Sequence, residues 1–166
     1  MKRDLRFEAE YPYPPERVWK ALTDSEAISQ WLMKNDFQPK LGHKFMFTST
    51  PQPGWDGRTY CEVIELDPPR RLAYTWKGGP IDTVVRWTLE PTPEGTKLVL
   101  EHTGFRGFKA LMVSAIMGSG WKGIVTTKIP GVLERMSADP SGHLWNVSSP
   151  AARGPETAAG REGKGE

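Results

Sequence analysis

His102 is the residue of this 166-residue chain whose type and position best suit chemistry. It alternates with Leu98 and Leu100 at the period of a half-buried strand, so its imidazole should point to the apolar side. A buried imidazole could orient a bound molecule or act as a general base. The sequence favours a structural histidine with both ring nitrogens hydrogen-bonded, because one histidine seldom makes a site.

Tyr74 and Glu62 are the other polar groups that could serve such chemistry, and both lie on predicted strands. The alternation along its strand places Tyr74 on the apolar side. Glu62 shares a face with Tyr60 and Ile64. An inward carboxylate there could act as a general acid or base, although a solvated position at a sheet edge is favoured.

Motifs for other chemistry are absent or weak. Gly118-Ser119-Gly120 lacks the Gly-x-Ser-x-Gly pattern of a nucleophile elbow and indicates a close-packing or hinge point in a helix. No phosphate-binding glycine loop occurs. Neither His43 nor His143 lies near a second metal-ligand pattern, and the single cysteine, Cys61, favours a buried and inert thiol. We therefore expect no catalytic residue, no metal site and no cofactor.

The composition indicates one folded domain. The chain is 37% hydrophobic and 25% charged, and its formal net charge of +2 is too small to argue by itself for a nucleic acid or an anionic membrane as the partner. No apolar run of about 18 residues occurs, and no apolar segment follows the charged residues 1–6. We expect no stable membrane insertion, no nucleic-acid partner and a cytoplasmic protein.

The elements that must position these residues are a strand, two short helices, a run of strands and a final helical segment. Alternating apolar residues from Leu5 to Tyr11 predict the first strand, and Pro14-Pro15 leads into a helix over 15–22. Asp24 or Ser25 can cap a second helix that reaches Trp31 and Leu32. Further strands are predicted at 44–50, 58–66, 71–77, 82–91 and 96–103. Their regular spacing predicts an antiparallel meander with one aromatic face.

The segment 107–136 is the candidate cover for that aromatic face. Its first half carries apolar residues at helical spacing: Phe108, Leu111, Met112, Ala115 and Ile116. Because Pro130 cannot continue a regular helix, this segment should form two helical pieces or one bent helix.

Several motifs occur in an order and spacing that resemble a known superfamily. They are Val18-Trp19 with Leu22-Thr23, Trp31, Arg70-Arg71-Leu72 with Tyr74-Thr75-Trp76, Gly95-Thr96, His102-Thr103-Gly104-Phe105, and Gly120-Trp121. From about residue 4 to 136 the chain resembles START-like (SRPBCC) domains. Within them it is similar to the branch named for the C-terminal domain of the activator of the heat-shock-protein-ninety ATPase.

This resemblance implies an α+β helix-grip fold for residues 1–136. In that fold a curved antiparallel sheet wraps around a long C-terminal helix, with two short helices after the first strand and a cavity between sheet and helix. Residues 137–166, rich in Ala, Gly, Pro, Ser and charge, are expected to form a disordered tail. The expected ligand-binding residues of the cavity are Trp31, Phe47, Tyr74, Trp76, Trp87, His102, Met112 and Ile116. Plain core packing is the alternative for each of them.

Three functions follow from the resemblance. The first, which we favour, is binding of a small hydrophobic molecule, whether lipid-like, aromatic or polyketide-like, in that cavity. The second is an enzyme of the polyketide cyclase or aromatase type, which would use His102, Glu62 or Tyr74. The third is a chaperone ATPase cofactor, ranked last because the chain lacks the separate N-terminal domain that such activators use; a protein or chaperone partner therefore stays open.

Overall fold

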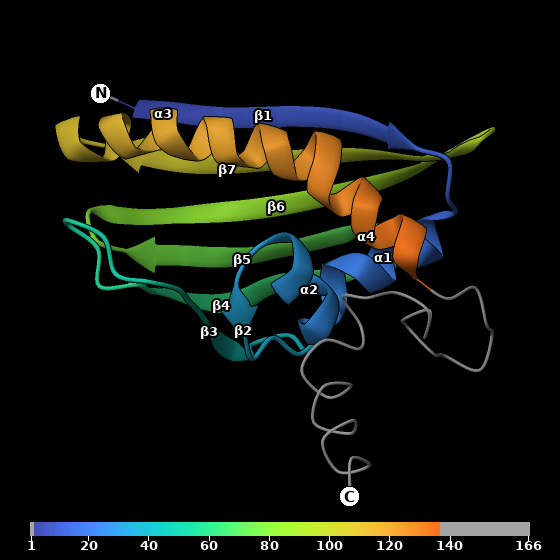
Figure 1. Cartoon of the computed structure of the whole chain (residues 1–166), viewed down its shortest axis with the longest axis horizontal. Helices are drawn as coiled ribbons and strands as arrows, with labels where there is room; N and C mark the ends of the chain where they lie inside the picture. The colour runs from blue at the N-terminus through green and yellow to red at the C-terminus, as the bar shows by residue number, and fades with distance from the viewer. Residues whose placement is uncertain (1, 137–166) are drawn as a thin grey trace, which may run out of the picture. The chain divides into compact units, whose positions relative to one another are not determined.

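A single sheet and a long helical segment make up the fold (Figure 1). The computed structural model describes residues 2–136. Strand β1 (Lys2–Tyr11) is followed by helices α1 (Pro15–Thr23) and α2 (Ser25–Trp31). The remaining strands are β2 (Lys34–Asn35), β3 (Lys44–Thr48), β4 (Arg58–Asp67), β5 (Arg71–Gly78), β6 (Ile81–Thr92) and β7 (Gly95–Arg106). The helical segment consists of α3 (Phe108–Gly123), the π-helical turn η1 (Ile124–Lys128) and α4 (Ile129–Arg135).

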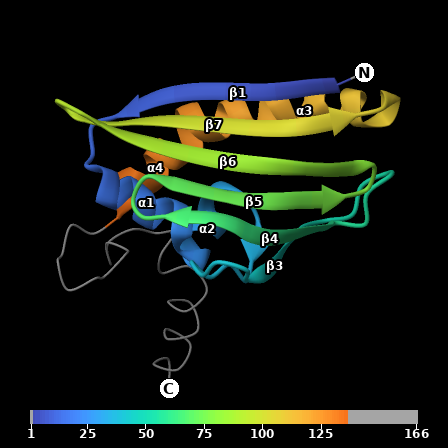
Figure 2. The ribbon, with the colours of Figure 1, turned by 180° about the vertical axis from the view of Figure 1, so that it is seen from behind.

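The seven strands form one antiparallel sheet in the order β1-β7-β6-β5-β4-β3-β2. Figure 2 shows the side of the sheet opposite the helices. Strands β3 to β7 follow one another as the predicted meander, and β1 pairs with the last strand, so that Tyr11 lies opposite Thr96. The predicted curved sheet, short helices and long C-terminal helical segment are confirmed, and the fold is a helix-grip fold.

The two short helices are held by local contacts that the sequence indicates. Pro15 occupies the first turn of α1, where a missing N–H costs nothing. The Asp24 carboxylate accepts a hydrogen bond from the Ala27 N–H at 3.0 Å and so caps α2. The Trp31 indole Nε1 donates to the Ala21 carbonyl at 2.9 Å. This bond fixes α2 against α1 and turns the Trp31 ring inward.

The irregularity expected near Pro130 is a π-helical turn, not a break. The Ile129 N–H bonds the Ile124 carbonyl, five residues earlier. The next carbonyl in this register belongs to Val125, and its donor would be residue 130, which as proline has no N–H. The Tyr11 hydroxyl donates to the Val125 carbonyl instead, at 2.6 Å. One side chain of β1 thus replaces the missing helical hydrogen bond.

Helix α3 packs on the sheet through small residues. Ala110 and Ser114 are buried, and a Cβ atom placed on Gly118 would lie 3.7 Å from Leu5 of β1. The Ser114 hydroxyl is satisfied by the Leu111 carbonyl at 2.6 Å. Small side chains at this spacing let the helix approach β1 closely.

The large apolar residues of the first part of α3 point away from the sheet. The exposed fractions are 73% for Phe108, 59% for Met112 and 73% for Ile116. This corrects the expectation that Met112 and Ile116 line the inner face. The physical reason is that α3 carries apolar residues on all sides, so helical spacing alone could not identify the side that packs.

The compact unit that contains the sheet ends at Leu133. The expected tail, residues 137–166, lies outside the described residues. Among the helices of residues 2–136, none has the length and apolar character needed to cross a bilayer.

Candidate functional site

Six of the eight predicted ligand-binding residues lie together, buried between the sheet and the helices; they are Trp31, Phe47, Tyr74, Trp76, Trp87 and His102. They come from α2 and from four strands, β3, β5, β6 and β7. Trp121 of α3 joins them, with its ring centroid 5.7 Å from both Trp76 and Trp87. We call these seven residues the inner aromatic cluster.

The rings of the inner aromatic cluster meet mostly edge to face. Trp31 and Trp87 have centroids 5.4 Å apart at an interplanar angle of 74°. Trp87 and Trp121 meet at 82°, and the tilted pair Phe47 and Trp76 is 5.2 Å apart. Such geometry is the favourable one for aromatic quadrupoles, so the cluster forms a continuous apolar wall.

His102 lies within this wall with both ring nitrogens hydrogen-bonded. The Trp121 indole, which can only donate, gives its Nε1–H to His102 Nδ1 at 2.9 Å. Nδ1 is therefore unprotonated, and Nε2 carries the hydrogen of the neutral ring. Nε2 donates to the Thr83 hydroxyl at 2.7 Å, and that hydroxyl donates to the Trp76 carbonyl at 2.9 Å. These three hydrogen bonds all donate in the same direction, from Trp121 through His102 and Thr83 to the backbone carbonyl of Trp76.

The surroundings of His102 keep it neutral. Burial lowers its pKa from 6.5 to about 3, because no water solvates the imidazolium form. A general base needs a free nitrogen and a pKa near the working pH, and His102 has neither. The arrangement matches the structural interpretation of this histidine.

The hydroxyl of Tyr74 is likewise hydrogen-bonded within the cluster. Its hydroxyl accepts a hydrogen bond from Trp87 Nε1 at 2.9 Å, and burial raises its pKa above the usual value. Among the tryptophans of the inner aromatic cluster, Trp31, Trp87 and Trp121 all donate their indole N–H. Among the described residues Trp76 Nε1 donates to none, and it is not one of the fully buried polar atoms that lack a partner. It is the open hydrogen-bond donor of the cluster.

The remaining candidates for chemistry do not join this cluster. Glu62 lies on the other side of β4, together with the exposed Tyr60 and Ile64. Burial raises the pKa of the Cys61 thiol, which favours an unreactive side chain. Within residues 2–136 no three His, Cys, Asp or Glu side chains gather in a way that could hold a metal ion.

Three contributors to the site were not among the expected ligand-binding residues. Thr83 follows the alternation of Val85 and Trp87, which could have placed it inward. Trp121 stands seven residues after the buried Ser114, which is two helical turns. Phe37, in the segment between β2 and β3, has its ring centroid 6.3 Å from that of Tyr74, and no periodicity signals it.

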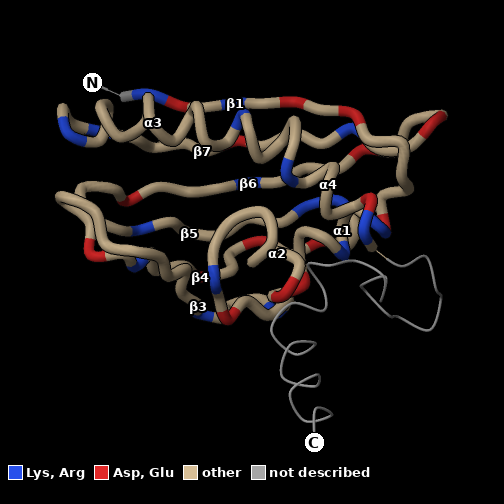
Figure 3. The backbone as a smooth tube through the Cα atoms, viewed as in Figure 1, with Lys and Arg blue, Asp and Glu red and all other residues tan. Residues whose placement is uncertain are grey.

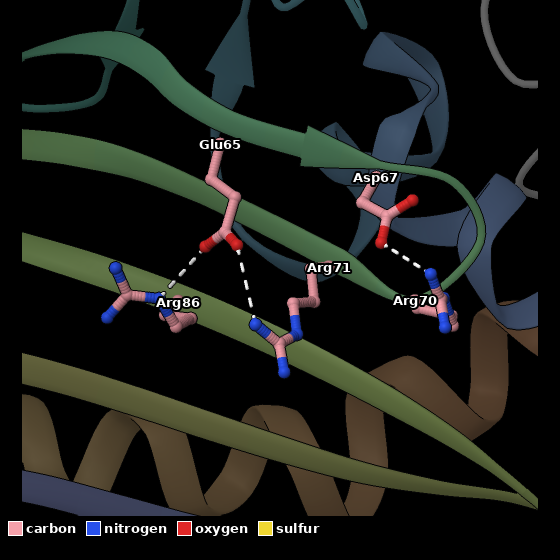
Figure 4. Close-up of polar contacts among 5 residues, drawn as sticks. All are labelled: Glu65, Asp67, Arg70, Arg71 and Arg86. Atoms are coloured by element: carbon pink, nitrogen blue, oxygen red, sulfur yellow. Dashed lines mark hydrogen bonds and ion pairs between the residues drawn. The ribbon is translucent and has the colours of Figure 1, made fainter.

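A hollow lies where β4 turns into β5. It has a volume of about 410 Å³ and is lined in part by Arg70, Arg71 and Glu90. Its guanidinium groups already have carboxylate partners, as Figure 4 shows: Arg70 contacts Asp67 at 2.9 Å, and Glu65 contacts Arg71 at 3.7 Å and Arg86 at 3.2 Å. These charges compensate one another at the surface, so the hollow is a weaker candidate than the inner aromatic cluster.

Comparison with known proteins agrees with the fold. A family model described as Activator of Hsp90 ATPase homolog 1-like protein matches residues 12–134. Protein MLL2253 from Mesorhizobium loti is 35% identical in sequence, with a TM-score of 0.73 over 81% of this chain and 99% of that chain. Protein BH1534 from Bacillus halodurans is 26% identical, with a TM-score of 0.69 over 80% of this chain and 99% of that chain.

A third similar structure is DynU16, described as a protein in the dynemicin biosynthetic locus. It is 25% identical, with a TM-score of 0.65 over 86% of this chain and 51% of the DynU16 chain. None of the curated proteins compared matches the sequence.

Proposed function

The chain belongs to the family of Activator of Hsp90 ATPase homolog 1-like proteins, and we propose that it binds a small apolar molecule against the inner aromatic cluster, between the sheet and α3. The bound part of the ligand is uncharged, because the cluster offers aromatic rings and a neutral imidazole but no charged side chain. An aromatic or lipid-like skeleton fits such a surface.

The observation that carries this proposal is the open N–H of Trp76. Every other indole of the cluster has an acceptor, and His102 and Tyr74 are engaged by Trp121 and Trp87. The Trp76 N–H is not among the fully buried polar atoms that lack a partner, so an acceptor on a ligand would form a hydrogen bond with it in place of solvent. The ligand class is therefore an apolar molecule with one carbonyl or ether oxygen.

Helix α3 supplies the means of entry. Its buried residues are Ala110, Ser114 and Trp121, so one large side chain anchors it to the inner face. Displacing the first turns of α3 costs few apolar contacts, since small side chains bury little area. Its later part stays attached through the bond between Tyr11 and Val125. A ligand can thus enter beneath the first turns while the rest of the helix holds.

The enzyme alternative has no observation in its favour. His102 and Tyr74 use their polar atoms within the cluster, and Glu62 lies on the opposite side of the sheet. The likeness to a protein in a biosynthetic locus fits a role with small molecules but names no reaction.

The test uses neutral aromatic ketones such as flavone, together with fatty-acid methyl esters. Binding should stabilise the protein saturably in thermal unfolding and should shift the Trp76 indole ¹⁵N–¹H resonance. Trp76→Phe keeps the ring and removes the donor, and it should weaken binding by about fivefold, the equivalent of one hydrogen bond. Trp55→Phe is the matched control, because the Trp55 indole already donates to the Arg58 carbonyl at 2.8 Å in a loop away from the cluster.

Two results would overturn the proposal. One is that no compound with this chemistry shifts any resonance of the inner aromatic cluster. The other is that binding responds equally to Trp76→Phe and Trp55→Phe.

A further inference from the structure

An apolar stripe runs along the outer side of α3. Phe108, Met112 and Ile116 are spaced four residues apart, which places them one above another on one side of a helix. Their exposed fractions of 73%, 59% and 73% are high for such large apolar side chains. A helix that is apolar on all sides is normally buried on all sides, whereas among the described residues nothing covers this one.

The charged side chains that α3 itself carries are all positive. The sequence of α3 contains Lys109 and Lys122 and no acidic residue. Figure 3 accordingly shows no red segment along α3. Both lysines are exposed and lie on opposite sides of the apolar stripe.

Two arginines extend this positive charge at the first turn of α3. Arg106 is exposed just before the helix, and the exposed Arg3 of β1 pairs with Phe105 of β7. The nearby acidic residue, Asp4, accepts a hydrogen bond from the Gly104 N–H at 3.0 Å. The apolar stripe therefore has Arg3 and Arg106, with the Asp4 carboxylate near them, at its first turn, Lys109 on one side, and Lys122 on the other side six residues beyond Ile116.

We propose that this face of α3 docks on a membrane surface that carries anionic lipids. The helix would lie in the plane of the interface, with Phe108, Met112 and Ile116 among the acyl chains and the basic groups at the level of the headgroups. This is a surface contact and not a span, in keeping with the absence of a bilayer-spanning helix among the described residues. The formal charge of the whole chain is only +2, so local placement and not net charge provides the attraction.

Charge also argues against a second copy of the chain as the occupant. Two α3 helices packed through this stripe would bring Lys109 and Lys122 of one copy close to those of the other. No carboxylate on α3 would compensate them, and like charges across an interface are unfavourable. The docking surface does not depend on the ligand proposed for the inner aromatic cluster, because the two lie on opposite sides of the helix.

The experiment is flotation of the full chain with two kinds of vesicle, phosphatidylcholine alone and phosphatidylcholine mixed with phosphatidylglycerol. The protein should float with the mixed vesicles, and added salt should reduce the bound fraction. The double variant M112S/I116S should bind at least about tenfold more weakly, since two apolar side chains no longer enter the interface. Lys109→Glu should weaken binding to the mixed vesicles in the same direction.

Matched controls are available on the far side of the sheet and in a loop. Ile64→Ser removes another exposed apolar side chain, and Lys40→Glu reverses another exposed charge; both should bind like the unchanged protein. Circular dichroism should show all variants folded, because every substituted side chain is exposed.

Three outcomes would overturn the inference. One is no flotation with the mixed vesicles. Another is equal loss of binding in M112S/I116S and Ile64→Ser. The third is a dimer in light scattering that M112S/I116S converts to a monomer, which would make a second copy the occupant of the stripe.

Discussion

Trp121 and His102 are joined by a hydrogen bond of 2.9 Å from the indole Nε1 to the imidazole Nδ1. The two residues come from α3 and β7, and their contact connects the helical segment to the sheet inside the aromatic core. Because an indole cannot accept, this bond also decides which imidazole nitrogen carries the hydrogen. Trp121 thus has a polar role in addition to its packing.

Replacing Trp121 by Phe tests that role. The variant keeps a ring but leaves Nδ1 of a buried imidazole without a donor, so the free energy of unfolding should fall by about 2 to 4 kcal/mol, from an unmet acceptor and lost apolar area. Imidazole ¹⁵N shifts should show an unprotonated Nδ1 in the unchanged protein. A His102 protonated on Nδ1 in the unchanged protein would contradict the assignment.

The low pKa of His102 predicts a specific dependence of stability on pH. Burial holds this pKa at about 3 in the folded protein, against 6.5 for an exposed imidazole. Between these two values the unfolded chain binds a proton that the folded chain does not. The stabilisation is therefore complete above the higher value and is lost as the pH falls toward the lower one, by about 1.4 kcal/mol per pH unit at most.

Urea unfolding at a series of pH values measures this loss. His102→Gln removes the titrating group, so its unfolding free energy should fall less steeply in the upper part of the interval, where most carboxylates are still ionised. Parallel profiles for the two proteins would show that His102 is not the source.

The Tyr11 hydroxyl and Pro130 form a natural pair for a double-mutant cycle. Tyr11→Phe should lower the free energy of unfolding by about 1 to 3 kcal/mol, because the buried Val125 carbonyl loses its donor at 2.6 Å. Pro130→Ala restores an N–H at the position that the π-helical register requires. In the Pro130→Ala background the cost of Tyr11→Phe should therefore shrink. Equal costs in both backgrounds would mean that the tyrosine does not replace the missing N–H.

The close approach of α3 to β1 can be tested at Gly118. Gly118→Ala should stabilise by about 0.5 to 1 kcal/mol, since its Cβ would meet Leu5 at an ordinary distance of 3.7 Å and helical alanine loses less entropy. Gly118→Leu should destabilise by about 1 to 3 kcal/mol through overpacking. Gly120→Leu is the control, because a Cβ there has no heavy atom within 4 Å. Chemical denaturation measures the unfolding free energy of the three variants. An equal loss of stability in Gly118→Leu and Gly120→Leu would contradict a close approach at Gly118.

The strands could be predicted because each is buried on one side only. Val85, Trp87 and Leu89 alternate with polar residues, and this period directly gives the face. The same alternation placed His102 correctly on the inner side. The two-residue strand β2 was missed, since it is too short to show any period.

The orientation of α3 could not be predicted for the opposite reason. With apolar residues on all sides, its sequence gives no preferred face, and the steric fit of small residues such as Gly118 against β1 decides the outcome. The π-helical turn depends on Tyr11, which is distant in the chain, and the donor to His102 depends on how α3 lies. These features are set by tertiary contacts and leave no local pattern.

The pairing of β1 with β7 has a consequence for the order of assembly. Among the strands of residues 2–136, β1 is made before the others, yet its one neighbour in the sheet is β7, and Tyr11 meets Thr96 only after most of the sheet has been synthesised. The strands from β3 to β7 can each pair with a neighbour that is adjacent in sequence. Such local pairings form early, whereas distant ones must wait for chain closure. The pairing of β1 with β7 is thus the one in this sheet that closes the longest stretch of chain.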